Sequence, residues 1–372
     1  MHPPKQLQPC REIWGEEQKM NLDITQQLQQ YVQNAFENTK PLAIVGGNSK
    51  SFYGHALSVD TLDVSKHQGV ISYEPTELVI TARAGTPLAD IEKLLHENGQ
   101  MLGFEPPAYA ETATLGGTVA CNFSGPRRVS CGAARDFLLG SKIINGKAEI
   151  LRFGGEVMKN VAGYDVSRLM AGAMGTLGVL LELSLKVLPR PESEITRVFD
   201  CTVEQALQYM HDWGQKPYPI SSTCYHNSHL HVRLSGSKQS VVTTGKIIGG
   251  EVLGDANRFW FALKEHQLDF FKTETPLWRL SLASDIAPLA LDGEYLYEWG
   301  GALRWLKSNE SVENIQATVA EQDGHALCFR SGKNQTTVFQ PLPLGLKTIH
   351  KNLKQAFDPK GILNPGRMYS EF

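Results

Sequence analysis

A short apolar run that ends in a glycine-rich loop constrains this chain more than any other feature. Residues 41–45 read Pro-Leu-Ala-Ile-Val, and such a run predicts a short buried strand. The loop at residues 46–54 follows, with the sequence Gly-Gly-Asn-Ser-Lys-Ser-Phe-Tyr-Gly. Successive backbone N–H groups in such a turn can form a concavity that binds an anion. Lys50 is the loop's only cation, so we expect backbone donors and small hydroxyls to hold a phosphate or pyrophosphate; a plain turn between two strands is the alternative.

The loop matches neither of the two common phosphate-binding motifs. The P-loop motif, Gly-x-x-x-x-Gly-Lys-Ser/Thr, is absent from it. The dinucleotide fingerprint Gly-x-Gly-x-x-Gly opens a helix, whereas this loop has a different glycine spacing and continues into Phe52 and Tyr53. If the loop binds a phosphate, it therefore belongs to another fold class.

Length and composition predict a globular protein of two domains. The chain has 372 residues, of which 41% are hydrophobic and 20% charged, and its net charge is -3. This charge gives no reason to expect a nucleic acid or an anionic membrane as a partner. No apolar run is long enough to span a bilayer, and the first residues contain no apolar signal region, so we expect a cytoplasmic protein.

The six cysteines are scattered, and no Cys-x-x-Cys pair occurs among them. This spacing argues against a zinc ribbon or an iron–sulfur cluster within the chain. It also provides no disulfide framework, which suits a reducing compartment.

Further glycine-rich segments follow the loop. Residues 113–117 read Ala-Thr-Leu-Gly-Gly, residues 172–179 read Gly-Ala-Met-Gly-Thr-Leu-Gly-Val, and a tail at residues 358–367 reads Asp-Pro-Lys-Gly-Ile-Leu-Asn-Pro-Gly-Arg. Residues 189–191, Pro-Arg-Pro, mark a domain boundary. Beyond it, predicted strands alternate with a few helices and no repeated βαβ unit, which favours an α+β module.

The order of these segments resembles that of the FAD-binding domain in vanillyl-alcohol-oxidase (PCMH-type) flavoproteins. Within that family, three stretches look like the FAD-binding subunits of glycolate oxidase, also called glycolate dehydrogenase. They read Lys-Asn-Val-Ala-Gly-Tyr-Asp at residues 159–165, Leu-Tyr-Glu-Trp-Gly-Gly at 296–301 and Asn-Pro-Gly-Arg-Met-Tyr at 364–369. The likeness covers residues 22–370.

The resemblance implies an α+β fold with two domains. A two-lobed PCMH-type FAD-binding domain would occupy residues 21–190, and a smaller α+β cap domain with an antiparallel sheet would occupy residues 191–343. Residues 344–372 would form a C-terminal helix and tail that return to the FAD domain. Residues 1–20 show no periodicity, and we expect a disordered extension there.

The same resemblance implies FAD as the cofactor. The loop at residues 46–51 would hold its pyrophosphate, Val179 would lie near the adenosine end and Asn364 near the flavin ring. The residues implied to bind FAD are Gly46, Gly47, Asn48, Ser49, Lys50, Ser51, Pro106, Thr114, Gly116, Gly117, Gly132, Val179 and Asn364.

Two departures from the family pattern carry information. Many covalent members have a histidine directly after the first two glycines of the loop, but this chain has Asn48, which cannot form a histidyl linkage. We therefore expect non-covalent FAD. The larger flavin subunit typically reads Gly-Ser-Glu-Gly-Thr-Leu-Gly at the corresponding place. Residues 172–178 of this chain read Gly-Ala-Met-Gly-Thr-Leu-Gly, without the acid, so this chain is not a shortened copy of that subunit.

We predict no catalytic residue from the sequence, although two groups of side chains are candidates for a site. A cluster of three histidines suggests a metal site: His226, His229 and His231. No acid nearby in the sequence completes such a site, and the spacing of the histidines also suits the polar face of a sheet. We therefore expect no metal. Arginines can clamp a substrate carboxylate in bidentate fashion. A surface or interface role is the alternative, which we favour for each candidate: Arg233, Arg279 and Arg304.

The resemblance implies a subunit of a complex that oxidises glycolate to glyoxylate. Its partners would be a larger FAD-linked subunit and an iron–sulfur subunit, with possible peripheral association with the inner membrane through the complex. Two alternatives stay open: a stand-alone FAD-linked 2-hydroxyacid oxidoreductase, and a mainly structural subunit whose FAD stabilises the fold.

Overall fold

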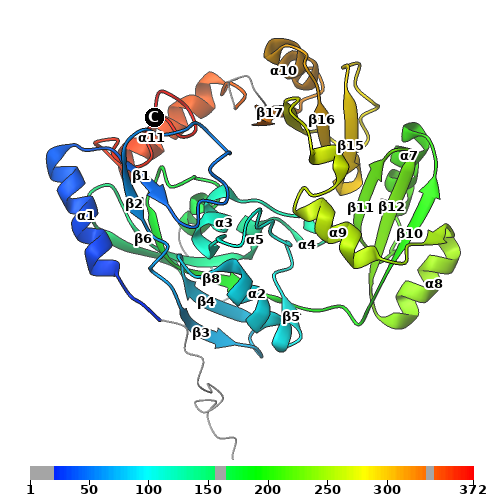
Figure 1. The fold of residues 1–372 in the computed structure, drawn as a ribbon, viewed down its shortest axis with the longest axis horizontal. Helices are drawn as coiled ribbons and strands as arrows, with labels where there is room; N and C mark the ends of the chain where they lie inside the picture. The colour runs from blue at the N-terminus through cyan, green and yellow to red at the C-terminus, as the bar shows by residue number, and fades with distance from the viewer. Residues whose placement is uncertain (1–20, 156–164, 332–338) are drawn as a thin grey trace, which may run out of the picture.

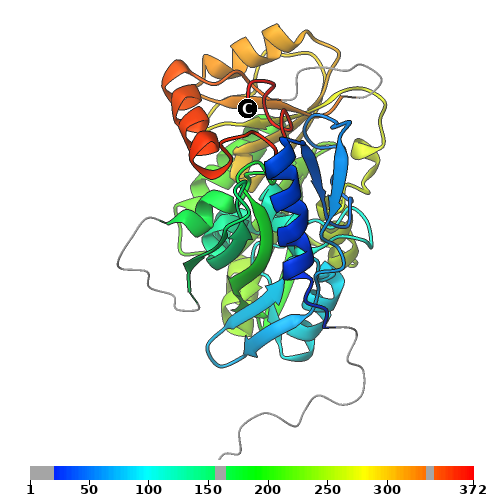
Figure 2. The same cartoon turned by 90° about the vertical axis from the view of Figure 1, so that its left-hand side faces the viewer.

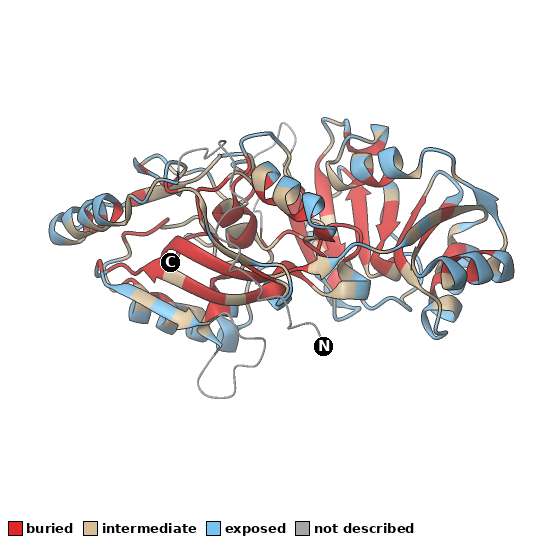
Figure 3. Ribbon diagram, turned by 90° about the horizontal axis from the view of Figure 1, so that it is seen from below, coloured by how far each residue is buried: buried red, intermediate tan, exposed pale blue. Residues whose placement is uncertain are grey.

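The computed structural model describes residues 21–155, 165–331 and 339–372. Two sheets, one in each half of the molecule, lie beside each other (Figure 1). Buried residues are concentrated in the strands of both sheets, while the outer faces of the helices are exposed (Figure 3). No helix in these three ranges is both long and apolar enough to cross a membrane.

The first half is built on a five-stranded antiparallel sheet with the strand order β3-β4-β8-β6-β7. Seven of the eight residues of its central strand β8 are buried. Val179, Leu181, Leu183 and Leu185 form one apolar face, whereas Glu182 and Ser184 are buried on the opposite face. The strands are β3 (Val70–Glu74), β4 (Val79–Arg83), β6 (Leu138–Ile144), β7 (Ile150–Gly154) and β8 (Val179–Lys186).

In the described residues, two small sheets and six helices accompany this sheet in the first half. The small sheets are a parallel pair, β1 (Leu42–Val45) with β2 (Asp60–Asp63), and an antiparallel pair, β5 (Gln100–Met101) with β9 (Leu188–Pro189). The helices are α1 (Thr25–Asn38), α2 (Leu88–Glu97), α3 (Leu115–Cys121), α4 (Arg128–Cys131), α5 (Ala134–Phe137) and α6 (Val166–Met170).

The second half contains an eight-stranded antiparallel sheet with the order β13-β10-β12-β11-β15-β16-β14-β17. The predictions of an α+β class and of an antiparallel cap sheet are confirmed. The strands are β10 (Ser193–Asp200), β11 (Ile220–His226), β12 (His229–Gly236), β13 (Glu251–Val252), β14 (Leu277–Ser281), β15 (Glu294–Glu298), β16 (Leu303–Lys307) and β17 (His325–Arg330).

Helices pack on the cap sheet through separate apolar clusters. Helix α7 begins with a capping box, in which Thr202 and Gln205 satisfy each other's backbone N–H groups. Trp260 and Leu263 of α9 join a cluster with Tyr53 and Phe123 of the first half, so apolar packing connects the two halves. The helices are α7 (Val203–Gly214), α8 (Lys238–Ile248), α9 (Ala256–Lys264) and α10 (Val312–Ala320), with short turns η1 (Asp269–Phe271) and η2 (Trp299–Gly301).

The C-terminal helix α11 (Leu344–Phe357) and the tail return to the first half, where Figure 2 shows them beside α1. The buried Nζ of Lys354 donates to Asp358 Oδ2 at 2.8 Å and to the carbonyl of Leu363 at 2.7 Å. Asp358 in turn accepts from the backbone N–H groups of Ile362 and Leu363. Lys354 Nζ also donates to the carbonyl of Thr176, so all three ammonium protons have acceptors and both carboxylate oxygens of Asp358 have donors. These bonds attach the tail to the first half.

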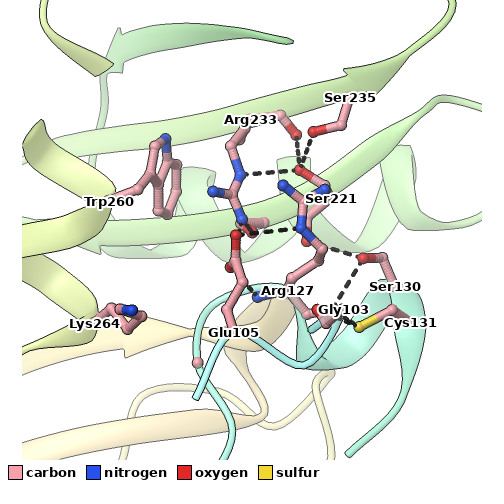
Figure 4. Close-up of polar contacts among 12 residues, drawn as sticks. Gly103, Glu105, Arg127, Ser130, Cys131, Ser221, Arg233, Ser235, Trp260 and Lys264 are labelled. Carbon is pink, nitrogen blue, oxygen red and sulfur yellow. Dashed lines mark hydrogen bonds and ion pairs between the residues drawn. The ribbon is translucent and has the colours of Figure 1, made fainter. Parts of the chain in front are cut away.

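A charged cluster joins the two halves at Glu105 (Figure 4). Arg127 Nε donates to Glu105 Oε1 at 3.2 Å, and Arg233 Nη2 of β12 donates to Glu105 Oε2 at 2.8 Å. Arg127 also reaches Glu194 of β10 at 2.6 Å. Burial raises the pKa of the Glu105 carboxyl, but the two guanidinium groups outweigh burial and hold that pKa below its ordinary value. Glu105 is therefore ionised, and it connects Arg127 of the first half with Arg233 of the second.

We predict that Arg233→Met lowers the free energy of unfolding by roughly 3 kcal/mol, because removing one partner leaves a buried charge poorly compensated. Arg233 also loses its bonds to Ser221 and Ser222. Denaturant unfolding monitored by tryptophan fluorescence measures the change. Arg135→Met, at an exposed arginine, is the matched control and should change stability little. Equal effects of the two substitutions would contradict this role for the cluster.

Candidate functional site

A cavity of about 370 Å³ opens beside the glycine loop. Its walls come from residues 43–51, from the first turn of α3, from residues 174–178 and from the C-terminal tail. Segments far apart in the sequence thus meet at one cavity, as the resemblance implied. Ten of the sequence-predicted residues line it: Gly46, Gly47, Asn48, Ser49, Lys50, Ser51, Thr114, Gly116, Gly117 and Asn364.

The backbone N–H groups of residues 46–50 are the main polar feature of this cavity. No protein group in the described part of the chain accepts a hydrogen bond from any of these five donors. Buried backbone donors are nearly always paired, so a run of free donors beside a cavity indicates an anionic ligand. This is the chemistry that a pyrophosphate needs, and the loop therefore fits FAD.

Gly47 allows the loop to pack closely against the segment before α3. A Cβ atom at this position would lie 1.4 Å from the carbonyl oxygen of Thr112, which no real contact permits. Thr112 Oγ1 also donates to the carbonyl of Gly47. At the next position the backbone of Asn48 has a φ of 55°, in the left-handed region that asparagine tolerates better than most residues. The loop sequence thus specifies the backbone conformation with which residues 46–51 line the cavity.

Asn364 fixes the other side of the cavity. Its Oδ1 accepts from the N–H of Ile44 at 2.6 Å, and its Nδ2 donates to the carbonyl of Met174 at 2.6 Å. Arg367 closes the tail over the loop by donating to the carbonyls of His55 at 2.7 Å and Ser51 at 3.1 Å. The tail therefore holds strand β1, the loop and residue 174 together.

Lys50 is buried at the end of the loop. Its Nζ donates to Ser49 Oγ and to the carbonyl of Ala108, each at 3.2 Å. Burial lowers the pKa of this ammonium group. A negative ligand in the cavity would offset the cost of burying the charge.

Three residues expected to bind the cofactor lie outside the lining of this cavity: Pro106, Gly132 and Val179. Pro106 is buried beside Glu105 at the joint, Gly132 ends helix α4, and Val179 is fully buried in the core at the start of β8. The family-like residues Lys159 and Tyr164 lie outside the described residues.

A second cavity of about 380 Å³ lies between the two halves, and no sequence motif predicted it. Cys121 lines both cavities, so the two are neighbours. The first half contributes Tyr109, Cys121 and Arg128 to the wall, among others, and the cap contributes the side chains of His266, Arg279, Glu298, Trp299 and Trp305.

Two guanidinium groups in the second cavity share one aromatic ring. The Arg128 guanidinium carbon lies 4.4 Å from the Trp299 ring centre, and that of Arg279 lies 5.2 Å from it. Trp299 has a φ of 55°, and Gly300 and Gly301 follow it with positive φ, so the Trp-Gly-Gly segment makes a sharp turn that presents the ring. Burial lowers the pKa of both guanidinium groups.

Glu298 is 5% exposed in this cavity. Burial raises the pKa of its carboxyl to about 7, although Trp305 Nε1 donates to Oε1 at 2.8 Å and Arg279 opposes the shift. Nearby, burial lowers the pKa of His266 well below its ordinary value, and Nδ1 of this ring is buried with no hydrogen-bond partner among the described residues. The cavity thus combines a carboxyl that titrates near neutrality with a neutral imidazole.

The surface or interface role that we favoured is wrong for Arg304, which is fully buried. Arg233 is 6% exposed and lies at the interface between the two halves, in the Glu105 cluster. Arg304 donates to the backbone carbonyls of Gly301, Ile286 and Ala287. Long-range pairing creates these environments, so local sequence did not reveal them.

Two of the three histidines have an acid close in space, although none is close to them in sequence. His226 Nε2 is 2.9 Å from Glu294 Oε1, and His229 Nε2 is 3.0 Å from Asp200 Oδ1, because the neighbouring strands β15 and β10 bring these acids close. His231 instead stacks on a phenylalanine, and burial lowers its pKa to about 4. Among the described residues, no three His, Cys, Asp or Glu side chains are placed to hold a metal ion.

We predict that Glu298 makes stability depend on pH. Its pKa is raised in the folded state, so its contribution favours folding below the pKa of the unfolded carboxyl and is lost as pH rises through about 7. Between about pH 5 and about pH 8, the stability difference between Glu298→Gln and wild type should therefore shift by on the order of 3 kcal/mol in favour of the variant. Denaturant unfolding at both pH values measures it, and a difference independent of pH would contradict the raised pKa.

Comparison with known proteins agrees with this geometry. Residues 22–154 match the FAD binding domain family. Among solved structures, p-cresol methylhydroxylase with substrate bound superposes with a TM-score of 0.69 at 16% identity, covering 93% of this chain and 87% of that one. Alkyldihydroxyacetonephosphate synthase superposes with a TM-score of 0.64 at 16% identity, covering 91% and 74%. These likenesses confirm the PCMH-type fold.

Sequence relatives extend the match beyond the FAD domain. D-lactate dehydrogenase of Anaerostipes hadrus is 29% identical over 196 residues, which are 50% of this chain and 41% of the relative. Glycolate oxidase subunit GlcD of Bacillus subtilis (strain 168) is 32% identical over 133 residues, 35% of this chain and 28% of the relative. Glycolate oxidase subunit GlcE of Escherichia coli (strain K12) is 49% identical over 349 residues, 94% of this chain and 98% of the relative. The chain therefore belongs to the family of glycolate oxidase subunit GlcE and carries an FAD binding domain.

Proposed function

We propose that this chain is the FAD-binding subunit of a multi-subunit glycolate oxidase, which oxidises glycolate to glyoxylate. One observation carries the proposal: the 49% identity to a glycolate oxidase subunit runs through 94% of the chain, including the cap and the tail. A match limited to the FAD domain would support only the cofactor.

The proposed FAD site is the first cavity. The free N–H groups of residues 46–50 would hold the pyrophosphate, with Ser51, Thr114, Gly116 and Gly117 around it and Asn364 beside the flavin ring. Three residues that do not line this cavity would contact the remaining parts of the cofactor: Pro106, Gly132 and Val179. When bound, FAD supplies two-electron oxidation chemistry. The chain's own contribution is to fix the cofactor with backbone donors and to surround it with apolar walls.

We propose that FAD is bound non-covalently. Asn48 is exposed at the position where a histidyl linkage would form, and His55 uses its backbone to hold the tail. An asparagine amide is not a nucleophile toward a flavin ring, so hydrogen bonds and packing would carry the whole affinity.

The proposed partners are a larger FAD-linked glycolate oxidase subunit and an iron–sulfur subunit. The word "subunit" in the names of the relatives GlcE and GlcD supports a multi-subunit enzyme. Among the described residues no three His, Cys, Asp or Glu side chains are placed to hold a metal ion, so an iron–sulfur cluster would belong to a partner. We place the complex in the cytoplasm or peripherally at the inner membrane.

The proposal includes a domain division: an FAD domain at residues 21–190, a cap at 191–343 and a returning tail at 344–372. The change from one sheet to the other after β9 supports the first boundary. Hydrogen bonds from Leu42 to the carbonyl of Ile362, and from Asn364 to the carbonyl of Leu42, support the return of the tail.

Acid precipitation tests both the cofactor and its linkage. We expect the purified chain to be yellow, and we expect acid to leave colourless protein while FAD remains in the supernatant, because no covalent bond holds it. Absorbance spectra and chromatography of both fractions provide the measurement. A chain purified with a stoichiometric partner but without flavin would contradict the proposal, and a yellow pellet would contradict the non-covalent linkage.

The same preparation separates the alternatives. Bleaching of the flavin by glycolate in the isolated chain would favour a stand-alone oxidoreductase. Flavin that stays oxidised while the assembled complex turns over would favour a mainly structural subunit. Our proposal predicts co-purification with a second flavoprotein and with protein-bound iron.

A further inference from the structure

A strained segment of the first half, residues 105–109, lies against the cap. Glu105 has a φ of 45° and Tyr109 a φ of 59°, both in the left-handed region that residues with a Cβ atom rarely adopt. Such conformations persist only where their surroundings hold them in place. The cap holds both ends of this segment: Arg233 pairs with Glu105 at 2.8 Å, and Glu265 binds the backbone at the other end.

Glu265, the residue that follows helix α9, binds the segment with both of its carboxylate oxygens. Oε2 accepts from the N–H of Tyr109 at 2.8 Å, and the N–H of Ala108 lies 3.2 Å from Oε1 and 3.1 Å from Oε2. Oε1 is also 3.2 Å from the ammonium group of Lys264. The Glu265 side chain is only 6% exposed, and hydrogen bonds to a carboxylate shielded from water are strong. One cap side chain therefore fixes two successive peptide groups of the first half.

The second of these peptide groups also binds Lys50 of the glycine loop. Lys50 Nζ donates to the carbonyl of Ala108 at 3.2 Å and lies 5.9 Å from the ring centre of Tyr109. The carbonyl of Ala108 and the N–H of Tyr109 are the two ends of one peptide group. This group therefore accepts from an ammonium at one end and donates to a carboxylate at the other, and such linked hydrogen bonds polarise and strengthen one another.

We propose that Glu265 of the cap is a positioning residue for the FAD site. Glu265 does not line the first cavity itself. It holds the peptide group between Ala108 and Tyr109, and this group holds the Lys50 ammonium at the loop that would bind the pyrophosphate. This role rests on the proposed function, which places FAD in the first cavity, and it makes the cap a part of cofactor binding.

Titration of the purified full chain with FAD, after its cofactor has been removed, tests this role. We expect Glu265→Gln to raise the dissociation constant of FAD roughly threefold to thirtyfold, because glutamine keeps the size of the side chain but loses the charged acceptor. A negative charge near Lys50 opposes the binding of an anionic cofactor, so its removal alone would tighten FAD binding. Positioning and simple charge repulsion therefore predict changes of opposite sign.

Two further variants complete the comparison. Glu265→Asp keeps the charge but shortens the side chain, so it should also weaken FAD binding, and it provides the test if Glu265→Gln does not fold. Glu92→Gln is the matched control, because Glu92 lies 3.8 Å from the same Lys264 ammonium but has no hydrogen bond to Ala108 or Tyr109. Its FAD affinity should equal that of the wild type. The melting temperature of each variant shows whether it is folded.

Lysine acylation with acetic anhydride, located by mass spectrometry in the FAD-free chain, separates positioning from a general loss of stability. Lys50 is 6% exposed, and Lys354 of the C-terminal helix is 7% exposed. Glu265→Gln should speed the labelling of Lys50 by roughly threefold or more and leave Lys354 unchanged, because only Lys50 loses its support and opens locally.

Two results would overturn the inference. One is unchanged or tighter FAD binding by folded Glu265→Gln and Glu265→Asp chains. The other is an equal increase in labelling at Lys50 and Lys354, which would show that the substitution loosens the whole fold. A wild-type chain that never holds FAD would instead overturn the proposed function, whereas the labelling of Lys50 would still measure its support by Glu265.

Discussion

The two hydrogen bonds of the Asn364 side chain hold together the part of the structure on which the rest depends. They connect β1 to the carbonyl of Met174, across sequence separations of 320 and 190 residues. The amide can make both bonds because it is a donor and an acceptor in one rigid plane. The Lys354–Asp358 pair fixes the tail that carries Asn364. With these contacts in place, the glycine loop has one conformation, and its N–H groups remain free for a ligand.

The joint between the two halves gives the second cavity its chemistry. Glu105 attracts Arg127 and Arg233 and so aligns the cap with the FAD domain. That alignment brings Arg128 of one half and Arg279 of the other to the same indole ring, although neither half alone contains the pair. The two cavities therefore depend on different contacts: the tail shapes the first, and the Glu105 cluster shapes the second.

Sequence reasoning succeeded for the fold, which the order of the glycine segments predicted. The loop residues predicted to bind FAD also line one cavity, although they come together with segments far away in the sequence. Sequence reasoning failed where strand pairing decides the environment. The acids beside His226 and His229 lie on neighbouring strands, and the burial of Arg304 follows from a loop 17 or 18 residues away. The second cavity was equally out of reach, since its walls meet only after the halves associate.

Hydrogen exchange at the glycine loop tests the central claim most directly. The account holds that backbone N–H groups of residues 46–50, free in the chain by itself, bind the FAD pyrophosphate. Exchange measured by mass spectrometry with and without FAD should show strong protection by FAD in peptides that cover these residues, because a hydrogen-bonded amide exchanges slowly. FAD bound in stoichiometric amount with no added protection at residues 46–50 would contradict the account.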